Sequence, residues 1–346
     1  MKKTTIIAEA GVNHNGSLDL ALRMIDTAAA AGADAVKFQT FIASKVVTRL
    51  ADKAGYQQAN TGNAESQYDM LRRLEMGRAE LSALIGHCRK AGIAFLSTPF
   101  ESESLALLIS LGLGTIKIPS GEITNLPFLR ETGGLGKEII LSTGMATLDE
   151  VADALRVLEE AGTAREDITL LHCTTDYPAK PDEVNLRAMN TLRDAFPGVA
   201  GVGYSDHTAG IDAALAATAL GAAIIEKHFT LDKTMPGPDH RASLEPDELA
   251  AMCRGIRAVE RMLGDGVKQP SVSEKANIPV ARKSLHAGRA IQAGEFFSAE
   301  NLAAKRPGTG LSPMHWDELV GKRAKRGYSE DEAIDPAELD AGRGPA

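Results

Sequence analysis

AGVGYSDHT (200–208) and AAIIEKHFT (222–230) are two short apolar runs that end in polar residues. Such β-branched runs are typical of strands buried on both faces of a parallel sheet. His207 and His228 stand at the polar ends of the two runs. Because the carboxyl ends of neighbouring parallel strands open onto one edge, the pattern predicts that both imidazoles point into one cavity.

The same pattern recurs along the chain and predicts eight strands. Between them lie Ala- and Leu-rich segments with apolar spacings of three and four, several of which stop at Gly, the usual C-terminal cap. Eight such units within about 260 residues predict an α/β fold of the (β/α)₈ TIM-barrel type. The rival is a doubly wound open sheet, but no GxGxxG follows the first strand and polar residues end nearly every strand. The predicted strands are residues 4–10, 34–40, 94–100, 115–122, 138–144, 168–177, 200–207 and 222–229.

The pattern also divides the chain into parts. Residues 1–265 are predicted to form the barrel, with a polar insertion at 41–78 on the face where loops carry function. Residues 266–281 (GVKQPSVSEKANIPVA) are predicted as a linker and 282–334 as a compact unit of short strands and turns. About 50 residues make a marginal core, so this unit is expected to dock on another surface. Residues 335–346 are predicted as a flexible tail.

Composition excludes several classes of partner. A net charge of −8 argues against nucleic acid and anionic membranes. The three cysteines lack CxxC spacing, so neither a disulfide framework nor a zinc cluster is indicated. The N-terminal segment reaches Glu9 too soon for a signal peptide, and no run approaches the roughly 18 apolar residues of a membrane span. A cytoplasmic location is the expectation.

His207 and His228 are the candidate metal ligands, with Glu9 as a possible helper. Two histidines without a close third ligand leave positions for water and substrate, as in a catalytic site. Mn²⁺, Mg²⁺, Co²⁺ and Zn²⁺ all suit such ligands. The alternative is that the histidines bond neighbouring groups or act as general bases.

Lys37 and Lys117 lie inside otherwise apolar strands, where an unpaired ammonium is costly. Together with nearby hydroxyls they predict a site for the phosphate and carboxylate of an anionic substrate. One alternative pairs each lysine with Glu9 or Glu122, and another makes one of them a Schiff-base lysine. The hydroxyls belong to Thr98, Ser120, Ser142 and Ser205.

Further candidates lie at strand ends and loops. Glu9 and Glu122 suit acid–base work or a sugar hydroxyl, although either could be a salt-bridge partner. Asp239 lies on the Pro- and Gly-rich loop MPGPDH, whose composition also fits a simple turn. Gln39 and Tyr177 are candidates for polar sugar contacts.

Taken in order, these segments resemble the sialic acid synthase family over nearly the whole chain. The matching stretches are IIAEAGVNHNGS, AVKFQT, FLSTPF, KIPSGE, ILSTGM, HCTTDYP, YSDHT, IEKHFTLD, GPDH, RKSL and KRPGTG. The resemblance implies a (β/α)₈ barrel followed by a small antifreeze-like (SAF) domain. It also implies a homodimer in which that domain caps the partner's barrel. The implied activity is condensation of phosphoenolpyruvate with an N-acetylmannosamine-type aldose, giving a nine-carbon 2-keto acid and phosphate.

The resemblance assigns roles residue by residue. His207 and His228 fall on the metal ligands, with Mn²⁺ the expected ion and Mg²⁺ or Co²⁺ as alternatives. Glu9 falls on an acidic residue of the family's site. The local sequence around Arg306 indicates only a solvent-exposed arginine, but the resemblance places it on an arginine that reaches across the dimer to the sugar's acyl group. Lys37, Thr98, Lys117, Ser120, Ser142 and Ser205 fall on phosphoenolpyruvate contacts, and Gln39, Glu122, Tyr177 and Asp239 on the sugar side.

Three segments look more like the N,N′-diacetyllegionaminate synthases of this family: CTTDYP with Thr175, SGEITNLP, and ESQYDMLRRLEM. Their sugar is 2,4-diacetamido-2,4,6-trideoxymannose, and the alternative is N-acetylmannosamine in an N-acetylneuraminate synthase. Gly121 counts against the pseudaminate synthases, which tend to have Phe there. The predicted reaction is attack of C3 of phosphoenolpyruvate on a metal-polarised aldehyde, addition of water at C2, and loss of phosphate by C–O cleavage. The rivals are a metal-free Schiff-base aldolase and a non-enzymatic carbohydrate- or ice-binding protein.

Overall fold

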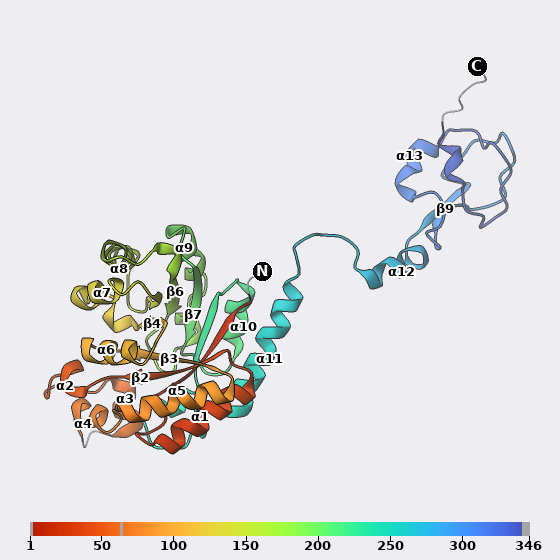
Figure 1. The fold of residues 1–346 in the computed structure, drawn as a ribbon. Helices are drawn as coiled ribbons and strands as arrows, with labels where there is room; N and C mark the ends of the chain where they lie inside the picture. The colour runs from red at the N-terminus through yellow and green to blue at the C-terminus, as the bar shows by residue number, and fades with distance from the viewer. Residues whose placement is uncertain (1–2, 63–64, 341–346) are drawn as a thin grey trace. The chain divides into compact units, whose positions relative to one another are not determined.

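Eight parallel strands form a near-closed barrel in the computed structural model, which describes residues 3–62 and 65–340 (Figure 1). The strand order is β3-β2-β1-β8-β7-β6-β5-β4, and β3 also contacts β4. Because β1 pairs with both β2 and β8, the (β/α)₈ prediction is confirmed and the doubly wound sheet is wrong. The strands are β1 (Thr5–Gly11), β2 (Ala35–Thr40), β3 (Ala94–Pro99), β4 (Thr115–Ile118), β5 (Glu138–Ser142), β6 (Ile168–Cys173), β7 (Gly201–Asp206) and β8 (Ile224–His228).

Alternating side chains on these strands fill two separate cores. One set meets inside the barrel, where Ile7, Ile140 and Leu171 belong to one buried cluster. The opposite set packs outward against the helices in a much larger cluster. The covering helices are α1 (Leu18–Ala31), α5 (Arg78–Ala91), α6 (Ser102–Ser110), α7 (Leu126–Gly133), α8 (Leu148–Ala161), α9 (Ala188–Ala195), α10 (Asp212–Ala219) and α11 (Pro246–Leu263).

The insertion at 41–78 forms three short helices: α2 (Ala43–Val46), α3 (Gly55–Thr61) and α4 (Gln67–Arg72). Its apolar side chains join Val12 and Phe100 in a small cluster of their own. The Asn60 side-chain amide donates to the Pro238 carbonyl oxygen over 2.6 Å. This bond ties α3 to the loop after β8, so the insertion lies at the carboxyl ends of the strands.

A second compact unit begins at Gly266. Its sheet pairs β9 (Ser284–Ala287) with antiparallel β10 (Leu302–Lys305), and it has its own buried cluster that includes Phe297 and Tyr328. The predicted linker is more ordered than its composition indicated, because helix α12 (Val272–Ala281) begins there at a capping box of Ser271 and Glu274.

The segment predicted as a flexible tail, 335–346, contains ordered residues at its start. Residues Pro336–Glu338 form a 3₁₀ turn, and Glu338 is buried because its carboxylate accepts a 2.7 Å hydrogen bond from the Tyr328 hydroxyl. Residues 341–346 lie outside the described residues. Among the helices of the described residues, none has the length and apolarity needed to cross a bilayer.

Candidate active site

A cavity of about 280 Å³ opens among the carboxyl ends of the barrel strands. Side chains from all eight strands or the loops that follow them line it, as in barrel enzymes generally. Twelve of the fourteen side chains singled out from the sequence meet here. They are Glu9, Lys37, Gln39, Thr98, Lys117, Ser120, Ser142, Tyr177, Ser205, His207, His228 and Asp239.

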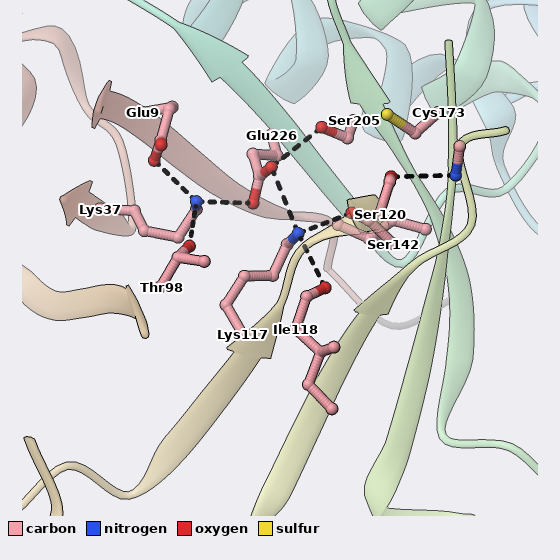
Figure 2. Close-up of polar contacts among 12 residues, drawn as sticks. Glu9, Lys37, Thr98, Lys117, Ile118, Ser120, Ser142, Cys173, Ser205 and Glu226 are labelled. Carbon is pink, nitrogen blue, oxygen red and sulfur yellow. Dashed lines mark hydrogen bonds and ion pairs between the residues drawn. The ribbon is translucent and has the colours of Figure 1, made fainter. Parts of the chain in front are cut away.

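Two buried lysines face each other across one carboxylate, that of Glu226 (Figure 2). The Nζ atom of Lys37 lies 3.6 Å from Glu226 Oε2, and that of Lys117 lies 3.7 Å from Oε1. Lys37 also pairs with Glu9 Oε2 at 2.9 Å and donates to Thr98 Oγ1 at 2.8 Å. Lys117 donates to Ser142 Oγ at 2.6 Å. Lys37 is therefore paired with Glu9, as the alternative to an anion site expected, and both ammonium groups share the carboxylate of Glu226.

Glu226 was missed in the sequence, although a signal for it was present. Side chains alternate along a strand, so Glu226 must share the inward face of β8 with His228, while Lys227 points outward. Its carboxylate accepts a 2.9 Å hydrogen bond from Ser205 Oγ on β7. Cys173, which was not singled out, also lines the cavity, as does Thr175 of the CTTDYP segment.

The charges of this cluster are set by burial and by one another. Burial alone would raise the pKa of Glu226, but Lys117 and Lys37 outweigh it and lower that pKa to about 2. Burial raises the pKa of Glu9 to about 7, even though Lys37 opposes the shift. At Lys37 the two glutamates overcome burial and the pKa is raised, whereas at Lys117 burial prevails and the pKa is lowered. Glu226 is therefore the permanent counter-ion, and Glu9 can change its protonation state near neutral pH.

The two imidazoles stand side by side, with ring centroids 5.4 Å apart. His207 Nδ1–H donates to the Thr174 carbonyl oxygen at 2.6 Å, so Nε2 carries the lone pair when the ring is neutral. Burial would lower the pKa of this ring, but Cys173 outweighs burial and the pKa is raised. Nδ1 of His228 is buried without a hydrogen-bond partner. Burial and the neighbouring His207 and Lys37 lower the pKa of His228 well below its usual value, so this imidazole is neutral.

These histidines fit a divalent cation. A neutral imidazole whose nitrogen has no hydrogen-bond partner can bind a metal ion through that nitrogen. In metal sites, a backbone carbonyl oxygen commonly accepts a hydrogen bond from the other ring nitrogen and so orients the ring. Within residues 3–62 and 65–340, no group of three or more His, Cys, Asp or Glu is arranged to hold an ion. The pair therefore suits an open site that shares its ion with substrate or water.

Aromatic rings cover the histidines from the insertion side. Tyr177 lies on His207 with centroids 4.0 Å apart, and Tyr56 of α3 stacks on Tyr177 at 4.9 Å. Asp239, on the loop after β8, has a buried Oδ1 without a partner, and burial raises its pKa to about 6. An unpartnered carboxyl group directed at a cavity is suited to a polar ligand atom.

Gly11 lets β1 end close against the site. Its φ of +53° lies in the left-handed region, at the register shift where β1 leaves β2. A Cβ atom at this position would lie 3.4 Å from the side chains of Glu9, Gln39 and His228 at once. That distance is an ordinary van der Waals contact, so the left-handed φ, and not a lack of space, favours glycine at this position.

Two predicted residues lie elsewhere. Glu122 is not a lining residue, and its carboxylate accepts from the Asn125 side chain in its own turn. Arg306 belongs to the second unit, where its Nε donates to the Ala281 carbonyl oxygen at 2.9 Å. The roles predicted for both remain predictions.

A (β/α)₈ barrel whose strand ends hold two lysines, two glutamates and two histidines around one cavity has the architecture of an enzyme active site. Comparison with known proteins identifies its family. The NeuB family matches residues 24–268 and the SAF domain matches residues 282–340, so the chain belongs to the NeuB family.

Individual relatives are similar over most of their length. N,N′-diacetyllegionaminic acid synthase from Campylobacter jejuni is 57% identical over 96% of this chain and 99% of that protein. The enzyme of the same name from Legionella pneumophila is 45% identical over 94% of this chain and 91% of that protein. The crystal structure of N-acetylneuraminic acid (sialic acid) synthetase from Leptospira borgpetersenii, in complex with citrate, matches with a TM-score of 0.68 and 36% identity. That match covers 80% of this chain and 90% of the other.

Proposed function

We propose that this protein condenses phosphoenolpyruvate with 2,4-diacetamido-2,4,6-trideoxymannose, giving N,N′-diacetyllegionaminate and phosphate. The observation that carries the proposal is the pair of buried lysines on either side of Glu226, with hydroxyls from four neighbouring strands or loops. The similarity to two N,N′-diacetyllegionaminic acid synthases selects the sugar.

The lysines would hold the phosphate and carboxylate of phosphoenolpyruvate, and so fix the plane of its alkene. Thr98 and Ser142 already accept hydrogen bonds from the two Nζ atoms and would keep the ammonium groups aimed at the ligand. Holding the nucleophilic C3 near the sugar's C1 is mainly a positioning effect, which can account for several powers of ten in rate. Glu9, with its pKa near 7, is placed to take or give a proton beside Lys37. Attack of C3 on C1, addition of water at C2 and C–O cleavage then release phosphate.

The proposal includes a divalent metal, Mn²⁺ before Mg²⁺ or Co²⁺, bound by His207 and His228. Such an ion would supply a Lewis acid for the sugar's carbonyl oxygen. The orphaned Nδ1 of His228 and the free Nε2 of His207 support it. Treatment with a chelator followed by dialysis should abolish turnover, and Mn²⁺ should restore it. Persistence of full activity in His207→Ala would contradict this assignment.

A phosphate-release assay tests the reaction and the sugar together. The wild-type protein, phosphoenolpyruvate and metal are incubated with the diacetamido-trideoxy sugar or with N-acetylmannosamine. We expect the larger kcat/KM with the former. A larger kcat/KM with N-acetylmannosamine would make the protein an N-acetylneuraminate synthase. No phosphate release with either sugar would reject the condensation itself.

We also propose a cytoplasmic homodimer in which Arg306 of each SAF domain reaches the sugar site of the partner's barrel. Charge supports this docking: residues 1–265 carry a net −9 and residues 266–346 a net +1. All three cysteines are free and buried, as suits a reducing compartment. Barrel 1–265, connecting segment 266–281 and SAF domain from 282 are the working boundaries.

A further inference from the structure

The cavity has two unlike walls. Every Asp, Glu and Lys that lines it comes from a barrel strand or from the loop after β8. The insertion 41–78 contributes nine lining residues and none of them is charged, although ten charged residues lie in that segment. The nine are Phe41, Val46, Val47, Tyr56, Gln57, Gln67, Met70, Leu71 and Leu74.

Packing holds the uncharged wall in place. Met70 and Leu74 are buried together with Phe41, whose ring meets Phe100 edge-on at 6.0 Å. Val46 and Leu71 are partly exposed and pack on this base. The wall therefore has a preformed shape.

Charged side chains of the insertion are engaged away from the cavity. Lys53 is bonded to Thr61 and to the Gly62 carbonyl oxygen, and Lys45 pairs with Glu103 at 2.7 Å. Neither lysine lines the cavity. The apolar character of the wall is thus a property of the folded insertion and not of its composition.

We propose that the insertion selects the sugar by holding alkyl and acyl substituents at the end remote from the reacting carbonyl, with Val47 and Leu71 as specificity-determining side chains. This inference rests on the proposed function, which places the reacting groups at the charged wall and leaves the rest of the sugar facing the apolar one. A methyl group gains from burial beside Val47 and Leu71, whereas a hydroxyl group beside these two side chains loses its water without gaining a hydrogen bond from them. The amides of Gln57 and Gln67 suit the amide of an acylamino group.

Two substitutions test the wall while conserving shape. Val47→Thr replaces a methyl group by a hydroxyl, and Leu71→Asn replaces a branched apolar end by an amide of similar outline. The matched control is Leu50→Gln, because Leu50 lies in the same insertion, is 92% exposed and does not line the cavity. For each protein, kcat/KM is measured with phosphoenolpyruvate and either 2,4-diacetamido-2,4,6-trideoxymannose or N-acetylmannosamine, after circular dichroism has verified folding.

We expect Val47→Thr and Leu71→Asn each to lower the ratio of kcat/KM for the diacetamido sugar to kcat/KM for N-acetylmannosamine by about tenfold. This change lies within the range by which apolar pockets distinguish such groups. The loss should fall on the diacetamido sugar, and Leu50→Gln should leave the ratio unchanged. An unchanged ratio in both folded wall variants would overturn the inference while leaving the condensation intact. Failure of the wild-type protein to release phosphate with any sugar would instead reject the proposed function, and this inference with it.

Discussion

The carboxylate of Glu226 lies between two ammonium groups in a buried cluster. Removal of its charge should therefore lower the stability of the folded protein, apart from any effect on the reaction. We expect Glu226→Gln to lower the free energy of unfolding at pH 7 by about 3 kcal/mol, because it leaves Lys37 and Lys117 with Glu9 as their remaining carboxylate. Inorganic phosphate should then raise the melting temperature of the variant more than that of the wild type, since the anion replaces the lost charge.

The control for Glu226→Gln is Glu103→Gln, which breaks an exposed pair with Lys45 and should cost less than about 1 kcal/mol. Since the pKa of Glu226 is lowered to about 2, the wild-type contribution is complete above the ordinary pKa of 4.5 and is lost as the pH falls toward 2. Equal phosphate-induced shifts in Glu226→Gln and wild type would count against the counter-ion role.

Glu9 should couple substrate binding to proton uptake. Its pKa is already raised to about 7, and a second anion beside Lys37 raises it further. The complex therefore binds more protons than the free protein, so the affinity for phosphoenolpyruvate should fall as the pH rises from 7 to 8. The ligand's own phosphate, with a pKa of about 6, is already about nine-tenths ionised at pH 7 and changes little over this range. Titration calorimetry in two buffers of different ionisation enthalpy measures the uptake, which Glu9→Gln should abolish.

On the scale of single elements, the tips of β7 and β8 are joined by a fully buried ion pair. Lys227 Nζ lies 2.8 Å from Asp206 Oδ2, and the two residues are register partners one position before the histidines. Asp206 Oδ1 also accepts hydrogen bonds from the backbone and hydroxyl of Thr208. This outward-facing pair therefore fixes the two strand ends that carry His207 and His228.

Lys227→Met should lower the free energy of unfolding by about 3–5 kcal/mol, because it leaves a buried carboxylate without its cation. Adding Asp206→Asn should recover part of that loss, since the amide keeps the bonds to Thr208 without a charge. Urea denaturation provides the measurement, with Lys45→Met as the exposed-pair control. A double variant as unstable as Lys227→Met alone would contradict the explanation by unpaired charge.

The strands could be predicted because each is an apolar run with a polar end, a pattern contained in a few consecutive residues. Glu226 could also have been predicted, because it lies two residues before His228 and side chains two apart on a strand share one face. In the segment EKH, however, only the histidine was taken as a candidate. The insertion wall could not be predicted, because Val47 follows helix α2 while Tyr56 and Leu71 lie in the separate helices α3 and α4. Which of their neighbours face the cavity depends on how those helices pack on Phe41 and Phe100, and no local spacing encodes that.

At the scale of the whole molecule, the proposed dimer predicts that Arg306 of one protomer completes the site of its partner. If Arg306 acts on the partner's site, each site takes His207 from one protomer and Arg306 from the other. The variants Arg306→Ala and His207→Ala therefore each remove one of these two residues. A heterodimer of the two variants then contains one site with both residues intact, and one with neither.

Complementation provides the decisive test of that arrangement. Each variant alone should be nearly inactive, and random exchange of subunits at equal concentrations should restore about a quarter of wild-type activity, because half of the dimers are mixed and each has one working site. Subunits are exchanged by dilution and reconcentration, and phosphate release is followed over time. If Arg306 served the barrel of its own chain, a mixed dimer would hold one defect in each site, and activity would stay at the level of the separate variants.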